Sequence, residues 1–397
     1  MQIKNILKKI VPRFIIIFRR KLIAVISEQF KKMQIAKIRK SQTLILEIIK
    51  KKEKVNIIFL VIHDSIWKYD EVYKLLNNDA KFNVKIAVIP LVREGEGQME
   101  TYYQTLKYFQ SKNYNIIESF DKENNCWIDI KSISSPDIVF FTNPHRLTFD
   151  KYYIHNFTDK LTCYVPYTFD ISINYQGQYN QSFHNLLWKF FLETKYHKNF
   201  ARDFSRIKDQ NVFVSGFIGM DRLLKSNFKP KKAWKNYNNN SAKKIIWAPH
   251  HTIQGQGLGL DYSCFMNYSE LFKQLVQNRT DIQIAFKPHP LLKEKLYKDS
   301  AWGIVKTNNY YKFWEDVPNG QLEDSDYLDL FYESDGMILD SASFTVEYLY
   351  CNKPSLFTLR DVDLNKRVNI FGEKVLEVVS KAKNAKDIHE FIDNEIL

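Results

Sequence analysis

The sequence predicts an α/β protein built from two Rossmann-like domains that face each other across a cleft, preceded by a basic helical arm. Three observations predict this fold. Short apolar runs alternate with helical segments, which is typical of a parallel sheet covered by helices. The alternation occurs twice, before and after a polar stretch at residues 226–242. The first 54 residues follow neither pattern and are strongly basic.

The N-terminal arm, residues 1–54, accounts for the net charge of +13. It contains 16 Lys/Arg and three Asp/Glu, whereas the rest of the chain carries 42 residues of each sign. A nucleic-acid enzyme usually carries its basic surface on its folded domains, so this distribution argues against nucleic-acid binding. The longest apolar run, Phe14–Phe18, is too short to span a bilayer. Arg19, Arg20 and Lys21 interrupt the apolar region that a signal peptide needs.

Within the arm, clusters of basic residues alternate with Ile, Leu and Phe, a composition that favours attachment to an anionic membrane surface. Each Lys or Arg close to such a surface contributes roughly 1 kcal/mol, so half of the cluster would hold the protein there. A solvated basic helix or a helix that binds a protein partner is the alternative interpretation. The four cysteines lie far apart, which predicts neither a zinc site nor disulfides and favours a reducing compartment.

The first α/β unit is expected to span residues 55–225. Its opening apolar run is short and continuous, as in a strand buried on both faces of a sheet. Strands are predicted at 55–62, 84–89, 138–142, 161–165 and 211–216, and helices at 67–77, 99–110 and 182–204.

Residues 226–242 are rich in Asn and Lys and lack apolar periodicity, so we expect an interdomain linker there. The second α/β unit then spans residues 243–397. Its strands are predicted at 245–248, 282–286, 336–339 and 355–358, and its helices at 264–277, 291–298, 327–332 and 343–351.

Polar segments follow three strands of the second unit. Pro249-His250-His251 follows the first, Lys287-Pro288-His289 the second and Asp340-Ser341-Ala342-Ser343 the third. Ligands of open parallel sheets collect beyond the carboxyl ends of the strands. The three segments are therefore expected to form one site for phosphate binding and proton transfer.

The third segment joins a strand directly to a helix. Ser341 or Ser343 can cap this helix, and its free N–H groups together with the helix dipole make an anion site. Simple capping without a ligand is the alternative. Lys287 and His289 lie on a loop stiffened by two prolines, where they could stabilise phosphate charge on a departing nucleotide.

His250 and His251 are adjacent, so in an extended segment their side chains would point to opposite sides. One of them can then face the cleft while the other is structural. Because no carboxylate or cysteine lies at ligand spacing, the sequence predicts no metal site at this histidine pair. No cofactor is expected either.

Several motifs together resemble the CDP-glycerol glycerophosphotransferase family of teichoic-acid and capsule enzymes. The main one is Tyr327–Leu349 followed by Lys353-Pro354, which is similar to the family's D-L…D-x-x-I-T-D-Y-S-S-x-x-x-E-Y-L…K-P pattern. The resemblance extends in the same order over about residues 210–360. Further matching segments are Val214–Gly216 with Asp221–Leu223, Trp247–Pro249 and Phe286–Pro290.

This resemblance implies a GT-B-like transferase that moves glycerol phosphate, or a related polyol phosphate, from a CDP-linked donor. The acceptor would be a hydroxyl of a lipid-linked or polymeric cell-envelope glycan, and the enzyme would lie on the cytoplasmic face of the bacterial membrane. Ser341 and Ser343 would hold the donor phosphates, and Lys287 and His289 would assist the leaving CMP. His251 and Asp340 belong to the same expected donor site. Glu347 would reach the donor ribose, with an ordinary helix residue as the alternative.

The sequence departs from the family where the acceptor base is expected. The family's W-H-G-T stretch is replaced by Tyr164–Asp170, which contains no histidine. His145 and Asp170, both predicted to follow strands, are the nearest substitutes for the base, and His250 could act from the other side. Two other functions stay open: a glycosyltransferase that uses a nucleotide sugar in surface polysaccharide synthesis, and a non-catalytic scaffold protein.

Overall fold

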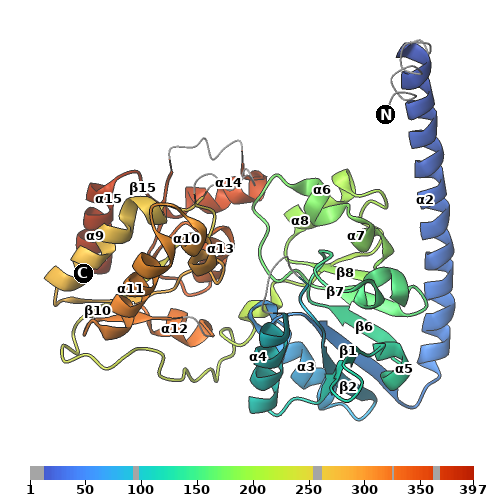
Figure 1. Cartoon of the computed structure of the whole chain (residues 1–397), viewed down its shortest axis with the longest axis horizontal. Helices are drawn as coiled ribbons and strands as arrows, with labels where there is room; N and C mark the ends of the chain where they lie inside the picture. The colour runs from blue at the N-terminus through green and yellow to red at the C-terminus, as the bar shows by residue number, and fades with distance from the viewer. Residues whose placement is uncertain (1–12, 93–97, 254–261, 324–325, 361–366) are drawn as a thin grey trace.

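The computed structural model describes residues 13–92, 98–253, 262–323, 326–360 and 367–397. Within these residues the chain forms two parallel β-sheets covered by helices, and a long N-terminal helix that projects from the body (Figure 1). The first sheet has the strand order β3-β2-β1-β6-β7-β8-β9, and the second has the order β12-β11-β10-β13-β14-β15. The expected pair of Rossmann-like domains is confirmed.

In the first domain, the apolar run that opens the sheet forms β1 (Val55–Val61), which pairs in parallel with β2 and β6. Phe59 and Val61 are fully buried there, because helices cover both faces of the sheet. The other strands are β2 (Phe82–Val88), β3 (Ile116–Glu118), β6 (Ile138–Phe141), β7 (Leu161–Tyr164), β8 (Lys189–Leu192) and β9 (Val212–Val214), with a hairpin of β4 (Phe120–Asp121) and β5 (Cys126–Trp127). The helices are α3 (Asp70–Asn77), α4 (Gln98–Ser111), α5 (Ile130–Ser134), α6 (Tyr175–Tyr179), α7 (Ser182–Leu186) and α8 (Lys195–Phe204), and the 3₁₀ turns are η1 (Asp64–Ile66), η2 (Asp150–Tyr152), η3 (Ile154–Phe157) and η4 (Ile218–Met220).

The prediction of one long helix over residues 182–204 is wrong. The segment forms α7, then strand β8 and then α8, because Phe190 and Leu192 are buried in alternation with their neighbours and pair in the sheet with β7 and β9. Thr194 starts α8, since its side chain accepts hydrogen bonds from the N–H groups of Tyr196 and His197. As a result, Glu193 lies between the last residue of β8 and the N-cap residue Thr194, at the carboxyl end of the strand.

In the second domain, β10, β11 and β13 are adjacent at the centre of the sheet. The strands are β10 (Lys243–Ala248), β11 (Ile282–Phe286), β12 (Gly320–Leu322), β13 (Gly336–Leu339), β14 (Ser355–Thr358) and β15 (Ser380–Ala382). The helices are α9 (Phe265–Asn278), α10 (Leu292–Lys298), α11 (Gly303–Asp316), α12 (Leu328–Glu333), α13 (Ala342–Leu349), α14 (Ile370–Glu377), α15 (Ala385–Phe391) and the π-helix η6 (Ile392–Ile396). The core on one face stacks Trp247 of β10 against Phe272 of α9 and packs Phe286 of β11 against Trp314 of α11.

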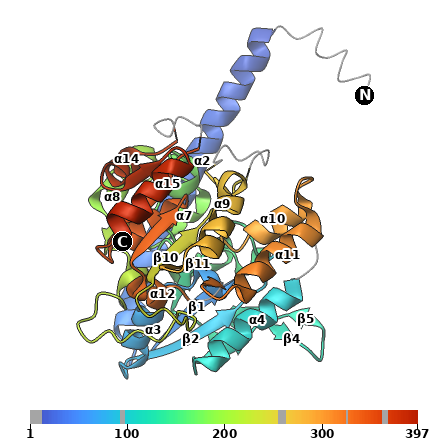
Figure 2. The same ribbon diagram turned by 90° about the vertical axis from the view of Figure 1, so that its left-hand side faces the viewer.

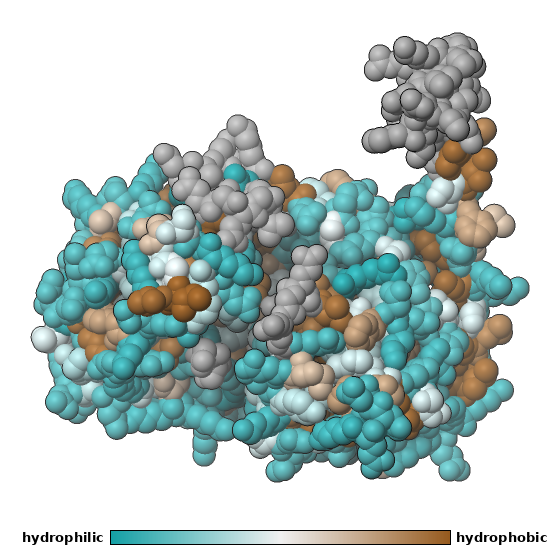
Figure 3. All heavy atoms as spheres, in the orientation of Figure 1, coloured by the Kyte–Doolittle hydropathy of each residue, from teal (hydrophilic) through white to brown (hydrophobic). Residues whose placement is uncertain are grey.

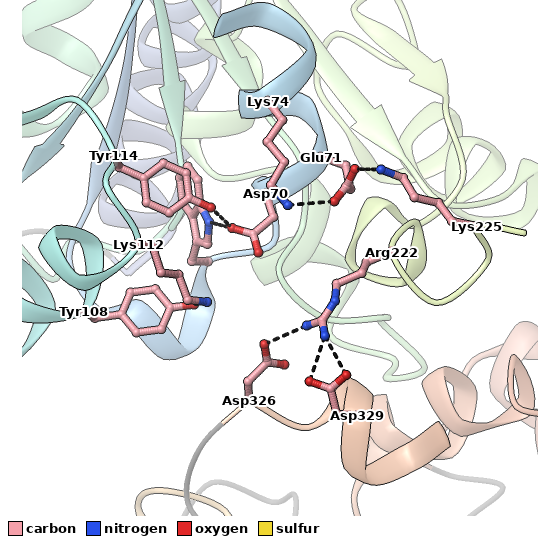
Figure 4. A network of polar contacts seen from close by, with 11 residues as sticks. Asp70, Glu71, Lys74, Tyr108, Lys112, Tyr114, Arg222, Lys225, Asp326 and Asp329 are labelled. Carbon is pink, nitrogen blue, oxygen red and sulfur yellow. Dashed lines mark hydrogen bonds and ion pairs between the residues drawn. The ribbon is translucent and has the colours of Figure 1, made fainter. Parts of the chain in front are cut away.

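The two domains contact each other through ion pairs beside α12 (Figure 4). Arg222, which follows η4 of the first domain, makes two hydrogen bonds of 2.5 and 2.7 Å to the carboxylate of Asp329 on α12, and a third of 3.2 Å to Asp326. The Nη2 group of Arg222 thus contacts both oxygens of Asp329, and such charge-assisted hydrogen bonds are shorter and stronger than neutral ones. They therefore hold the domains in a defined relative position.

An apolar cluster at the same boundary also joins the domains. An antiparallel β-bridge between Ser172 of the first domain and Val368 of the second also joins their backbones. The buried members of the cluster from the first domain are Phe169, Ile171, Phe217 and Met220, and those from the second are Leu328, Val346, Phe357, Val368, Val375, Leu376 and Val379.

Within the described part of the N-terminal arm, one helix, α2 (Arg13–Lys50), is formed, and its C-terminal half packs on the first domain. Ile35 and Ile49 are buried against the domain, and the Gln42 side chain donates to the Leu186 carbonyl oxygen. The N-terminal half projects beyond the body in both views (Figures 1 and 2). In the described part of the chain, no helix has the length and apolar character that crossing a bilayer requires.

Candidate active site

The carboxyl ends of the central strands of the second sheet bring the predicted polar segments together. β10 pairs with β11 on one side and with β13 on the other. Past the strand ends, the N–H of Lys287 donates to the Trp247 carbonyl oxygen at 2.8 Å, and the N–H of His289 donates to that of Pro249 at 3.0 Å. The segments after β10 and β11 therefore run side by side, as the strand-end argument predicts.

Three imidazoles cluster at this point: His250, His251 and His289. The ring centroid of His251 lies 4.3 Å from that of His250 and 4.2 Å from that of His289, and the His250 and His289 centroids are 5.1 Å apart. The expectation that His250 and His251 point to opposite sides is wrong. The backbone turns at His251, whose carbonyl oxygen accepts from the N–H of Ile253, so the segment is not extended.

Hydrogen bonds fix which nitrogen of two of these rings carries the proton. The backbone N–H of Thr252 donates to Nδ1 of His250 at 3.3 Å, and the N–H of Leu291 donates to Nδ1 of His289 at 3.1 Å. Because a backbone N–H can only donate, each Nδ1 is an acceptor and each neutral ring carries its hydrogen on Nε2. Both rings therefore offer an Nε2–H donor.

This arrangement bears on what the cluster can bind. One ligand atom from each of His250, His251 and His289 lies within 4.8 Å of the others, a spacing that could surround a metal ion. The sequence analysis expected these segments to meet but predicted no metal site, because it weighed only the His250–His251 pair and found no carboxylate or cysteine at ligand spacing. A metal needs an unprotonated ring nitrogen, whereas the Nδ1 acceptor bonds leave hydrogens on Nε2 of two rings. The donor set fits an anion such as a phosphate.

Burial lowers the pKa of His250 to about 3, with smaller contributions from His251 and Lys295. The His250 ring is therefore neutral at physiological pH and acts as a hydrogen-bond donor without a charge of its own. In a buried site, such fixed donors stabilise developing negative charge.

Cationic side chains complete the site. Lys287 is 7% exposed and its Nζ lies 3.4 Å from the Glu323 carbonyl oxygen. Arg360 follows β14, next to β13, and its Nη1 atom is buried without a hydrogen-bond partner in the described parts of the chain. Its charge acts on Asp340 and Cys264. Arg360 was not predicted from the sequence, because it follows β14, whereas the predicted site comprised the segments after β10, β11 and β13.

Both carboxylate oxygens of Asp340 are hydrogen-bonded to the backbone. Its two carboxylate oxygens accept from the backbone N–H groups of His250 at 2.5 Å and Cys264 at 2.6 Å. It is almost completely buried, and burial raises its pKa to about 7. Asp340 thus ties the segment after β10 to the start of α9. The prediction that it binds the donor phosphate is replaced by a role in holding the loop that carries His250.

Ser341 occupies the N-cap position of α13, but its side chain makes no capping hydrogen bond within the described residues. Its carbonyl oxygen accepts from the backbone N–H of Thr345 at 3.1 Å and from the Thr345 hydroxyl at 2.7 Å. The Ser341 hydroxyl is therefore not committed to capping the helix, which is compatible with the predicted contact to a donor phosphate.

Ser343 and Glu347 lie in a polar cluster that crosses the domain boundary. Their side chains are bonded to each other, and the Tyr327 hydroxyl donates to the other oxygen of Glu347. From the first domain, Lys68 Nζ donates to the Tyr327 hydroxyl at 2.9 Å, and the N–H of Phe169 donates to Ser343 Oγ at 3.1 Å. Burial lowers the pKa of Lys68 and raises that of Tyr327. Ser343 and Glu347 therefore join α13 to the first domain in this structure.

The two candidate bases of the first domain follow strands of the other sheet. His145 follows β6, and its Nδ1 is 3.3 Å from the Gln181 side-chain nitrogen; burial lowers its pKa. Asp170 follows β7 and accepts from the Ser172 hydroxyl at 2.7 Å and the Tyr179 hydroxyl at 3.1 Å, while burial raises its pKa. Both oxygens of Asp170 are thus already hydrogen-bonded.

Known proteins share this architecture. A UDP-N-acetylglucosamine 2-epimerase aligns with a TM-score of 0.55 at 15% identity, covering 86% of this chain and 87% of that chain. The wall teichoic acid polymerase TagF, in a variant form, aligns with a TM-score of 0.52 at 12% identity, covering 93% of this chain and 89% of that chain. At such identities the likeness concerns the fold, which is GT-B-like. No curated protein matches the sequence.

The family model described as CDP-glycerol:poly(glycerophosphate) glycerophosphotransferase matches residues 178–391, more than half of the chain. The matched stretch contains β10, β11 and β13 with the polar segments that follow them. The resemblance noted from the sequence motifs is confirmed. The chain therefore belongs to the CDP-glycerol:poly(glycerophosphate) glycerophosphotransferase family and is a transferase.

Proposed function

We propose that the chain transfers glycerol phosphate, or a related polyol phosphate, from a CDP-linked donor to a hydroxyl of a lipid-linked or polymeric cell-envelope glycan. The observation that carries this proposal is the pair of Nε2–H donors on His250 and His289. The centroids of the two rings lie 5.1 Å apart beyond the strand ends of the second sheet, and Lys287 and Arg360 follow the strands β11 and β14 of the same sheet. Family membership supplies the reaction class.

In the proposed reaction the acceptor hydroxyl oxygen attacks the phosphorus of the glycerol phosphate group. A new P–O bond forms, and the pyrophosphate bond breaks so that CMP leaves with the bridging oxygen. Negative charge develops on the departing phosphate, where fixed N–H donors and cations are most effective. We assign the stabilisation of this charge to His289, His250 and Lys287. The hydroxyl of Ser341 would bind the remaining phosphate oxygens.

A donor panel tests the proposal. The full-length protein is incubated with CDP-glycerol, CDP-ribitol, and UDP- and GDP-sugars, each with a short poly(glycerol phosphate) oligomer, and the free nucleotide is measured. We expect CMP release from CDP-glycerol or CDP-ribitol. Release of UDP or GDP instead would identify a glycosyltransferase. No release from any donor would contradict the proposed activity and favour a scaffold protein.

We also propose that the arm attaches the enzyme peripherally to the cytoplasmic face of the bacterial cell membrane. The projecting half of α2 exposes apolar side chains that do not pack on the body (Figure 3). Seven basic and no acidic residues lie among residues 1–27, so this segment combines apolar and cationic groups. The exposed apolar residues are Leu22, Ile23, Val25, Ile26 and Phe30.

Removal of residues 1–27 is expected to lower binding to phosphatidylglycerol vesicles at least tenfold, because seven positive charges are lost. This truncation keeps the ion pair of Glu28 with Arg206 and the packing of Gln42 and Ile49. The remaining part of α2 therefore still packs on the first domain. Co-sedimentation measures the bound fraction, with phosphatidylcholine vesicles as the control. Equal binding of the truncated and full-length proteins would contradict membrane attachment through the arm.

A further inference from the structure

A second polar site lies in the first domain, outside the histidine cluster. A small pocket lies at the carboxyl ends of β7 and β8. Its lining residues come from the two strand ends and from α6. The polar residues of the lining include Tyr167, Thr168, Asp170, Tyr179 and Glu193.

Glu193 is the unusual member of this lining. The residue is 5% exposed, and neither carboxylate oxygen accepts a hydrogen bond from another residue in the described parts of the chain. A buried carboxylate without partners costs several kcal/mol, so proteins rarely keep one without a use. By contrast, both oxygens of Asp170 are bonded to Ser172 and Tyr179. A ligand hydroxyl would therefore find its acceptor on Glu193 and not on Asp170.

The nearby His197 does not neutralise Glu193. Its Nδ1 is 3.6 Å from a Glu193 oxygen, too far for a hydrogen bond, and lies 2.7 Å from the Thr194 hydroxyl. Its Nε2 donates to the Asp170 carbonyl oxygen at 3.0 Å. Burial lowers the pKa of His197 to about 4, so the ring is neutral at physiological pH, and burial raises the pKa of Glu193 to about 8. A carboxyl group with a pKa of about 8 is mostly protonated at pH 7, so its base form, and with it the rate of transfer, should increase as the pH rises through 8.

The pocket borders the donor side of the enzyme. The segment Tyr167–Asp170 lines the pocket, and the N–H of Phe169 in its middle donates to Ser343 Oγ on α13 at 3.1 Å. The Phe169 ring centroid also lies 6.3 Å from that of Tyr350, which follows α13. One short segment therefore contacts both the pocket with Glu193 and the helix that begins at the predicted phosphate serines.

We propose that this pocket receives the polyol end of the acceptor and that Glu193 takes the proton of the attacking hydroxyl. This inference rests on the proposed function. As the acceptor oxygen forms its bond to the donor phosphorus, the hydroxyl proton passes to a Glu193 oxygen and CMP leaves with the electrons of the broken P–O bond. The Tyr167 and Thr168 hydroxyls supply hydrogen bonds to the other oxygens of a polyol.

The test compares Glu193→Gln with the full-length wild-type enzyme, using CDP-glycerol and a short poly(glycerol phosphate) oligomer. Glutamine keeps the size of the side chain but cannot take the proton. We expect the kcat of transfer to fall about 100-fold or more. The Kd for CDP, measured by titration calorimetry, should stay within about twofold. Glu193→Asp, which restores a carboxylate, should recover at least about tenfold of the lost kcat.

Asp137→Asn is the matched control. Asp137 is also a buried carboxylate of the first domain, but it lies at the amino end of β6, whereas Glu193 follows the carboxyl end of β8, and it is bonded to Lys52 at 2.6 Å. The kcat of the Asp137→Asn enzyme should stay within about threefold of the wild-type value.

A Glu193→Gln enzyme with kcat within threefold of the wild type would overturn the assignment of Glu193 alone. An equal loss of CDP affinity and kcat would also overturn it, because it would indicate a structural role. A wild-type enzyme that releases no nucleotide from any donor would contradict the proposed function together with this inference.

Discussion

Replacing His289 by alanine is expected to lower the kcat of nucleotide release by about 10²- to 10³-fold, the usual effect of losing one fixed donor to developing charge. The His289 ring is held by the Leu291 N–H on Nδ1, so its Nε2–H is set in place before the reaction. Its backbone is fixed as well, by the hydrogen bond to the Pro249 carbonyl oxygen. Such a donor stabilises the leaving phosphate without reorganisation during the reaction.

The effect should appear in kcat more than in donor affinity, because charge on the bridging oxygen develops only as the bond breaks. Steady-state CMP release from CDP-glycerol measures kcat and KM. His389→Ala, on the exposed surface of α15, is the control and should leave both values unchanged. A His289→Ala enzyme with wild-type kcat would remove the histidine cluster from the reaction and with it the basis of the proposed donor site.

The strands buried on both faces were the part of the fold that sequence reasoning predicted best. The bounds of β11, β13 and β14 agree with the predicted strands, because each contains buried apolar residues and begins directly after Asp281, Asp335 or Pro354. The strand β8 was missed since Lys189–Leu192 lies among aromatic residues that also suit a helix. The three-residue strands β3, β12 and β15 are too short to show a period of their own.

The candidate site was predictable to the extent that it follows from strand order. His250, Lys287 and His289 were identified because three parallel strands end at one edge. Two features could not be found this way. Asp340 was expected to bind the donor phosphate, but its carboxylate accepts hydrogen bonds from two backbone N–H groups. This contact depends on the local turn, which the sequence pattern does not show. Glu193 was hidden inside a predicted helix, and its strand-end position became visible only once β8 was placed.

Asp340→Ala is expected to destabilise the second domain by about 2–5 kcal/mol, since it leaves two buried N–H groups, of His250 and Cys264, without acceptors. The loss in free energy of unfolding caused by Asp340→Ala should depend on pH. Burial raises the pKa of Asp340 to about 7, above its ordinary value in the unfolded chain. A raised carboxyl pKa means that the folded state binds the proton more tightly, so this stabilisation is full below about pH 4 and is lost as the pH rises through 7.

The difference in free energy of unfolding between wild type and Asp340→Ala should therefore be larger at pH 5 than at pH 8. Urea denaturation followed by tryptophan fluorescence measures it, because Trp247 and Trp314 lie in the core of the same domain. Asp316→Ala, exposed at the end of α11, should change the stability by less than about 0.5 kcal/mol at either pH. An equal cost of Asp340→Ala at both pH values would show that Asp340 stays ionised throughout. The loop that carries His250 would then be held by a permanent charge, and His250 would keep its position across the working pH range of the enzyme.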